Sequence, residues 1–183
     1  RSLLIIGGSG GVGSIAIQLA RRAGLLVIAT ASRPESRAWC ERMGAGHVVD
    51  HSQPLAPQLA ALGLEAVDGI ANLSDTDAYW EQMAQVIRPQ GSIVAIVGNR
   101  SPLDLNLLKA KSVSFHWEFM FTRPQFHTPD RGRQGEILAR LAAAVDAGAL
   151  RSTAHTHLGG ISAAALGQAH QLLEEGRSIG KIV

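Results

Sequence analysis

The chain has 183 residues, of which 46% are hydrophobic and 17% charged, and its formal net charge is +2 at pH 7. These values are typical of a folded domain with one hydrophobic core and exclude a predominantly disordered chain. No apolar run reaches the roughly 20 residues that span a bilayer, no basic block suggests nucleic acid, and a single cysteine, Cys40, excludes an internal disulfide and fits a reducing, cytoplasmic setting.

The first residues have the pattern of a buried strand. Leu3 to Ile6 form a continuous apolar run that enters a glycine cluster, which is typical of a strand covered on both faces. Because the chain starts with Arg1 rather than Met and reaches this strand at once, we expect it to be a piece of a longer polypeptide.

Helix and strand patterns then alternate. In chain order they predict a helix from Val12 to Gly24, a strand at 25–31, a helix at 34–43, a strand at 48–49, a helix at 55–62 and a strand at 67–73. Next come a helix from Asp75 or Asp77 through Ile87, strands at 92–97 and 113–121, a surface loop at 124–132, a helix at 134–147, and a tail with a strand at 153–157, a helix at 162–175 and a strand at 179–183. This alternation predicts an α/β fold, a doubly wound parallel sheet of about six strands in the Rossmann arrangement.

The helix at 34–43 carries clear boundary signals. Pro34 suits the first helical turn, Ser32 is predicted as the N-cap, and Glu35 completes a capping box. Gly44 is expected to end the helix.

The glycine cluster fits the pattern G-x-G-x-x-G between a strand and a helix, which is the context of dinucleotide binding. We expect Gly8 to permit a tight turn, Gly10 to let the backbone approach a pyrophosphate, and Gly13 to let the helix pack close to the strand. The N–H groups of Gly11 and Val12 would face the anion, aided by the helix dipole.

The end of the second strand indicates which dinucleotide is bound. NAD sites usually place an Asp or Glu there, whereas this strand ends in Ala31 followed by Ser32 and Arg33, with Arg37 one turn further on. A hydroxyl, a guanidinium and a helix N-terminus favour a 2′-phosphate, so we predict NADP(H). His51, after the third strand, is positioned to reach the ribose or the phosphate.

The residues that two other kinds of site require are absent from the sequence. Short-chain dehydrogenases need a Tyr-x-x-x-Lys pair, but the sole tyrosine, Tyr79, has Met83 four residues later. A zinc site needs three or four ligands. Only His155 and His157 alternate along one strand, with no third ligand evident, so no metal site is predicted.

Three stretches together carry a family resemblance: "GGSGGVGSIAIQLARRAG", "VIATASRPES" and "MGAGHVVDH", supported by the ending "LLEEGRSIGKIV". The chain resembles the cofactor domain of the medium-chain dehydrogenase/reductase superfamily. Within the superfamily it is most similar to the branch of quinone oxidoreductase-like and zinc-type alcohol dehydrogenase-like proteins.

This resemblance implies a GroES-like catalytic domain before residue 1, to which residues 150–183 would return as a tail. It implies hydride transfer from NADPH to a small-molecule quinone, enone or carbonyl, with the catalytic residues on the other domain. The chain alone would then bind NADP(H) weakly and turn over nothing. The alternative is a non-catalytic domain that senses a nucleotide, or a lens-type structural relative.

The resemblance also assigns cofactor contacts beyond the glycines and the arginines. It places Asn72 and Leu73 near the ribose, Val97, Gly98 and Asn99 near the nicotinamide, Phe119, Met120 and Phe121 beside the nicotinamide or substrate, and gives Lys181 a weaker claim. His51 stands where relatives often have a tyrosine. Relatives dimerise through equivalent sheet edges, so the apolar strand at 113–121 is expected to form a homodimer.

Overall fold

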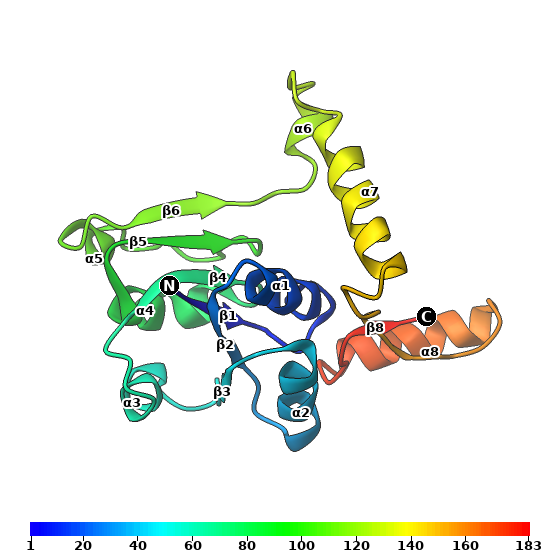
Figure 1. The fold of residues 1–183 in the computed structure, drawn as a ribbon, viewed down its shortest axis with the longest axis horizontal. Coiled ribbons are helices and arrows are strands. Elements are labelled where there is room, and N and C mark those ends of the chain that lie inside the picture. The colour runs from blue at the N-terminus through cyan, green and yellow to red at the C-terminus, as the bar shows by residue number, and fades with distance from the viewer.

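The computed structural model describes residues 1–183 and contains a six-stranded parallel sheet with helices on both faces (Figure 1). In chain order the elements are β1 (Ser2–Ile6), α1 (Gly11–Arg22), β2 (Leu26–Thr30), α2 (Pro34–Met43), β3 (His47–Val49), α3 (Leu55–Ala61), β4 (Val67–Asn72), α4 (Thr76–Val86), β5 (Ile87–Ala95), α5 (Asn106–Lys109), β6 (Ser114–Trp117), α6 (Thr122–Gln125), α7 (Arg133–Asp146), β7 (Ala154–Thr156), α8 (Ala163–Glu174) and β8 (Lys181–Ile182). The strand order is β3-β2-β1-β4-β5-β6, so the predicted doubly wound α/β class is confirmed. None of the helices combines the length and the hydropathy that a membrane crossing requires.

The first strand divides the core between two faces. Leu4 and Ile6 pack in one cluster with residues of α3 and α4, while Ile5 packs in a second cluster with residues of α1 and α2. Side chains alternate along a strand, so one continuous apolar run supplies both layers. As a result β1 lies in the middle of the sheet, and the loop after it opens at the sheet's carboxyl edge.

Helix α2 has the predicted range, but its N-cap lies one residue later than predicted. The N-cap is Arg33, not Ser32, and the predicted capping box with Glu35 is absent. Instead the Ser36 hydroxyl accepts a hydrogen bond from the Arg33 N–H and donates one to the Arg33 carbonyl. Because Pro34 occupies the first helical position, the cap must be the residue directly before it. Gly44 ends the helix in the left-handed region, as predicted.

Strand β5 begins earlier than predicted and passes through a proline. It pairs with β4 at Ile87 and again from Ser92 onward, with a shift of register between these positions. The intervening segment holds Pro89, and Gln90 in a left-handed conformation. Proline has no N–H to donate to a neighbouring strand, and a residue in a bulge makes no such hydrogen bond. Pro89 is therefore tolerated inside the strand. The helix predicted to run through Ile87 therefore stops at Val86.

The apolar stretch at 113–121 is only partly a strand. Strand β6 covers Ser114–Trp117 at the sheet edge, and a turn follows in which the Thr122 N–H donates to the Phe119 carbonyl. Helix α6 then occupies the start of the predicted loop at 124–132. Apolar content alone does not distinguish a buried strand from exposed aromatic residues in a turn, which explains the error.

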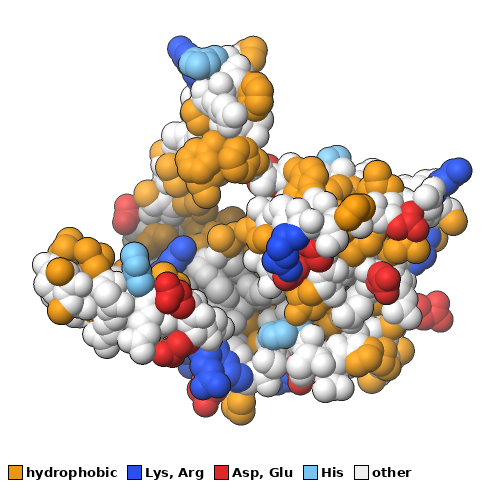
Figure 2. Space-filling view, turned by 180° about the vertical axis from the view of Figure 1, so that it is seen from behind, with side chains coloured by type: hydrophobic (Ala, Val, Ile, Leu, Met, Phe, Trp, Pro, Cys, Tyr) orange, Lys and Arg blue, Asp and Glu red, His pale blue; other side chains and the backbone are white.

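Helix α7 stands away from the sheet and buries none of its residues (Figure 1). Hydrophobic side chains gather on the projecting arm that carries α6 and α7 (Figure 2). The chain then returns to the sheet, and β7 and β8 form a separate parallel pair. In this pair Ala154 lies opposite Lys181. The predicted tail strands therefore exist, but outside the main sheet.

The carboxyl end of α4 depends on one lysine. The Lys111 ammonium donates to the carbonyl oxygens of Ala84, Gln85 and Ile87, each at 2.8 Å. We expect Lys111→Met, which keeps the aliphatic stem, to lower the free energy of unfolding by about 2 kcal/mol because hydrogen bonds to a charged donor are lost. Urea unfolding measures this effect. Lys109→Met, at an exposed position without such bonds, is the control, and equal losses in both variants would contradict the role given to Lys111.

Candidate functional site

The loop between β1 and α1 is shaped by its glycines, but not as predicted in every position. The left-handed residue is Gly7, with φ +85°, so the tight turn assigned to Gly8 belongs to its neighbour. A Cβ on Gly8 would lie 2.8 Å from the Cβ of Ala29 and 3.2 Å from the sulfur of Cys40. Gly8 therefore allows the loop to pack against β2 and α2.

Gly13 has the close-packing role that was predicted for it. A Cβ there would lie 2.3 Å from the Gly7 carbonyl oxygen and 2.6 Å from that of Gly8. These contacts are with backbone, which has no flexible end that can move aside. Gly10 is different, because its nearest neighbour would be the Gly7 oxygen at 3.5 Å, an ordinary contact distance.

The N-terminus of α1 has donors without acceptors. The N–H groups of Gly11, Val12 and Gly13 have no hydrogen-bond partner in residues 1–183. The N-cap is Gly10, which offers no side-chain cap, and the first turn holds no acidic residue. Free N–H groups and the positive end of the helix dipole together attract an anion.

A lysine from the far end of the chain lies over the same helix terminus. A Cβ on Gly11 would lie 2.2 Å from the Cε of Lys181 and 2.8 Å from its Nζ, so the end of this flexible side chain lies directly against Gly11. No carboxylate lies within ion-pair distance of Lys181. A cation beside the positive end of a helix is unfavourable by itself, so the pair indicates space for a negative charge.

The arginines after β2 form a second basic region. The half-buried Arg33 donates from Nη2 to the carbonyl of Arg177 at 2.7 Å. Arg37 donates to the carbonyls of Ala31 at 3.3 Å and Val48 at 2.8 Å, which ties the ends of β2 and β3 together. Neither the Arg33 nor the Arg37 guanidinium is paired with a carboxylate. The exposed Ser32 lies beside them without a capping role.

His51 follows β3 and has an unsatisfied ring nitrogen. Its Nδ1 is buried and has no hydrogen-bond partner, which normally costs free energy. The adjacent Asp50 accepts from the Ser52 N–H and hydroxyl, and these bonds hold the pKa of Asp50 below its ordinary value. His51 therefore has an anionic neighbour and an unused nitrogen.

The ends of β4 and β5 are occupied by local contacts. The buried Asn72 side chain donates to the Thr76 hydroxyl and accepts from the Ser74 N–H, so it has little left for a ribose. The Leu73 N–H donates to the Ile6 carbonyl, and the Val97 carbonyl accepts from Thr76. Only Gly98 keeps open space around it.

The loop that carries Asn99 is held by two acidic residues of the α4 terminus. Asp77 accepts from the N–H groups of Arg100 and Ser101, and these bonds lower its pKa. The Arg100 side chain pairs with Asp75, which lowers the pKa of that carboxyl as well. Asn99 itself donates to the Ser101 carbonyl, so the loop is internally tied.

The three residues predicted to lie beside the nicotinamide or substrate are on the projecting arm. Phe119, Met120 and Phe121 are between 52% and 65% exposed. Met120 and Phe121 line one open cavity with Ile137 and Leu138 of α7. These residues are therefore separate from the glycine loop within this chain.

Comparison with known proteins identifies the family. A family model described as zinc-binding dehydrogenase matches residues 43–183. The chain belongs to this family. A zinc-type alcohol dehydrogenase-like protein of Staphylococcus aureus is 45% identical over 183 residues, which is all of this chain and 55% of that protein. The predicted membership of the medium-chain dehydrogenase/reductase superfamily is thus confirmed.

Solved structures agree with this assignment. A crystal structure titled as a putative zinc-dependent alcohol dehydrogenase of Rhizobium etli is 49% identical, has a TM-score of 0.93, and is matched over 99% of this chain and 53% of its own. A mycobacterial protein solved in complex with NADPH is 25% identical, with a TM-score of 0.82 over 99% of this chain and 55% of its own. The chain spans about half the length of these zinc-binding dehydrogenase relatives.

The family name raises the question of a metal, and the residues of this chain do not fit one. No group of three or more His, Cys, Asp or Glu side chains is arranged to hold an ion in residues 1–183. Cys40 is buried, burial raises the pKa of its thiol to about 12, and it belongs to no group of three or more side chains that could hold an ion. His155 packs against the ring of Trp39 instead.

Sequence reasoning missed or undervalued part of this dehydrogenase site. Arg177 was not predicted, and Lys181 was given only a weak claim. The Lys181 side chain lies over Gly11 and the Arg177 carbonyl accepts from Arg33, although each residue is more than 100 positions away in the sequence from its partner. The only sequence signal was the Gly-Lys pair before the final apolar residues, which matches the family ending.

Proposed function

We propose that this chain is the NADP(H)-binding domain of an oxidoreductase. The observation that carries the proposal is the N-terminus of α1, where three free N–H groups and the Lys181 ammonium surround one position without any carboxylate. A pyrophosphate supplies the negative charge and the acceptor atoms that this arrangement lacks. When bound, the nicotinamide supplies the hydride, while Gly10, Gly11, Val12 and Gly13 hold the diphosphate.

The preference for NADP(H) over NAD(H) is argued from the basic region after β2. A carboxylate at the end of β2 would accept the ribose hydroxyls of NAD and repel a 2′-phosphate. This strand ends without one, and the Arg33 and Arg37 side chains lie beside it without carboxylate partners. The exposed Ser32 hydroxyl adds a further donor. A relative solved with NADPH agrees with this choice.

For the whole protein, we propose hydride transfer to a quinone, an enone or a carbonyl compound in the cytoplasm. A catalytic domain preceding this chain would supply the catalytic residues, and residues 150–183 would return to it. The open cavity lined by Met120, Phe121, Ile137 and Leu138 is the proposed contact surface for such a domain or its substrate. The exposed edge of β6 is the proposed surface for a homodimer.

Titration with the two nucleotides tests the cofactor proposal. We expect NADPH to bind at least tenfold more tightly than NADH, because one extra phosphate meets unpaired guanidinium groups. Arg33→Ala should weaken NADPH binding by about tenfold and leave NADH binding nearly unchanged. Isothermal titration calorimetry measures both constants.

Arg140→Ala is the matched control, since this exposed arginine lies on α7 and pairs with no carboxylate. It should leave both affinities unchanged. Tighter binding of NADH than NADPH would overturn the role given to the arginines, and binding of neither nucleotide would overturn the cofactor proposal for this chain.

A further inference from the structure

The tail reaches the glycine loop by direct backbone contacts. The Gly180 N–H donates to the Ser9 carbonyl at 2.8 Å, and Gly10 and Gly180 form an isolated parallel bridge. The next residue is Lys181, whose position over Gly11 therefore depends on this docking. The charge at the anion site is thus supplied by a segment about 170 residues away in the sequence from the loop it completes.

A buried tryptophan packs under the docked tail. Trp39 of α2 is 6% exposed and belongs to the same core cluster as Ile179. Its ring meets that of His155 edge to face, with 4.9 Å between centroids. A Cβ on Gly180 would lie 3.0 Å from Cζ2 of Trp39, so the tail chain passes directly against the indole.

The same indole is linked to the glycine loop through the Ser14 hydroxyl. Trp39 Nε1 donates to the Ser14 hydroxyl at 2.8 Å, and that hydroxyl donates to the Gly10 carbonyl at 2.7 Å. Because Ser14 is fully buried and its oxygen accepts from Trp39, its proton is directed to Gly10. The Trp39 side chain thus contacts the tail through its ring and is linked to the glycine loop through its N–H and Ser14.

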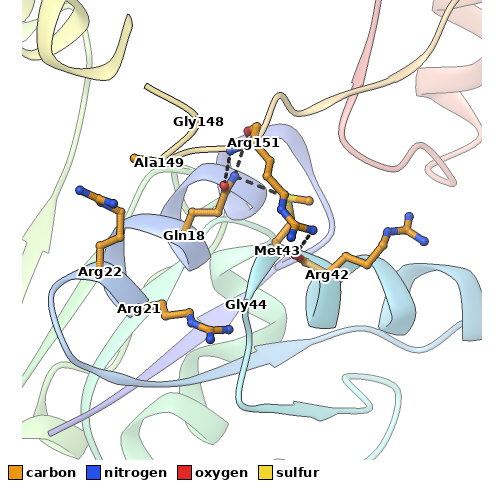
Figure 3. Close-up of a pocket in the computed structure, with 9 residues that line it drawn as sticks. All are labelled: Gln18, Arg21, Arg22, Arg42, Met43, Gly44, Gly148, Ala149 and Arg151. Atoms are coloured by element: carbon orange, nitrogen blue, oxygen red, sulfur yellow. Dashed lines mark hydrogen bonds between the residues drawn. The ribbon is translucent and has the colours of Figure 1, made fainter. Parts of the chain in front are cut away.

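A second buried side chain holds the start of the tail. Figure 3 shows Gln18 of α1 facing the backbone of Arg151: its oxygen accepts the Arg151 N–H at 2.7 Å, and its nitrogen donates to the Arg151 carbonyl at 3.2 Å. The Gln18 nitrogen also donates to the Ser14 carbonyl at 3.1 Å. Helix α1 therefore holds the start of the tail through Gln18. The end of the tail packs on Trp39 of α2, which is hydrogen-bonded to Ser14 of α1.

We propose that Trp39 is a positioning residue that couples docking of the tail to binding of the dinucleotide, an inference that rests on the proposed function. When the tail is docked, Lys181 completes the anion site. When the anion is bound, Lys181 is held and the tail is stabilised. Coupling of this kind is reciprocal, so each event strengthens the other by the same factor.

Hydrogen exchange of the tail amides and NADPH titration test this coupling together. In the unaltered chain, NADPH should slow exchange in residues 179–183, where the N–H groups of Gly180 and Lys181 are bonded. Trp39→Phe keeps a ring and removes the N–H donor. It should speed exchange of the tail without nucleotide and weaken NADPH binding by about five- to tenfold.

A second variant and a matched control separate this role from general stability. Ser14→Ala removes the hydroxyl that links Trp39 to the Gly10 carbonyl. Trp39→Phe combined with Ser14→Ala should therefore weaken NADPH binding no more than either change alone. Trp80→Phe is the control, because Trp80 is also buried and donates from Nε1 to a carbonyl, that of Asp104, in the other core layer. Trp80→Phe should alter neither the hydrogen exchange of the tail amides nor the affinity for NADPH.

Two results would overturn the proposal: tail exchange in Trp39→Phe equal to that in Trp80→Phe, or a loosened tail with unchanged NADPH affinity. If the unaltered chain binds no NADPH, the proposed function fails and the coupling with it. Exchange measured without nucleotide then still decides whether Trp39 holds the tail, so the two failures are distinguishable.

Discussion

Gly13→Ala is expected to abolish measurable NADPH binding and to lower the free energy of unfolding by about 3 kcal/mol. Alanine favours helix over glycine, so propensity alone predicts a small gain in stability. The added Cβ, however, would lie 2.3 Å from the Gly7 oxygen and 2.6 Å from the Gly8 oxygen. Helix α1 and the loop must then separate, which moves the free N–H groups away from the diphosphate. The expected loss of affinity is on the order of a hundredfold or more.

Two glycines serve as controls for this variant. Gly135→Ala in α7 adds a Cβ with nothing within 4 Å, so it should be neutral or stabilising. Gly10→Ala meets only an ordinary 3.5 Å contact and should leave the fold intact, so it is a control for stability. Denaturant unfolding and NADPH titration measure all three variants. Unchanged affinity in Gly13→Ala would mean that the loop does not hold the nucleotide.

The elements that the sequence predicts well are those whose signals are local. The helix at 34–43 has its proline at one end and a glycine at the other, and the structure places both boundaries there. The buried first strand and the glycine turn also depend on neighbours within about ten residues. Such signals act through backbone conformation and capping, which need no knowledge of the rest of the chain.

Predictions were wrong where the same residues are compatible with two different local structures. Ser32 and Ser36 both flank Pro34, and only the position of the proline decides that Ser36 makes the capping contacts. Phe119 and Phe121 continue an apolar run that suits a strand, but they lie in a turn after β6. The difference depends on whether another surface covers them, which a single sequence does not contain.

Contacts between distant segments were the least predictable part of the site. Arg37 is predicted to assist in holding the 2′-phosphate, and only the fold shows that its guanidinium also donates to the carbonyls of Ala31 and Val48. Arg177 and Lys181 join the site only because the tail docks on α1 and α2. No spacing rule links positions that are more than 100 residues apart. Arg177 was therefore found from the fold, and Lys181 had only the family ending as its sequence signal.

Lys181→Glu is expected to weaken NADPH binding on the order of a hundredfold. Removing the ammonium loses a charge-assisted hydrogen bond to a phosphate oxygen, worth about tenfold, and the new carboxylate adds repulsion of similar size. Lys181→Met isolates the first of these effects, since it keeps an apolar stem over Gly11 and should cost about tenfold. Fluorescence titration of NADPH at two salt concentrations measures both variants.

The control is Lys109→Glu, which changes the net charge by the same amount at an exposed position on α5. It should leave affinity nearly unchanged, because exposed charges more than about 10 Å apart are largely screened at 0.1 M salt. The unaltered chain should lose affinity as salt rises, and Lys181→Met should show a weaker dependence. If Lys181→Glu and Lys109→Glu behave alike, the ammonium above Gly11 has no part in holding the diphosphate, and the anion site reduces to the free N–H groups of α1.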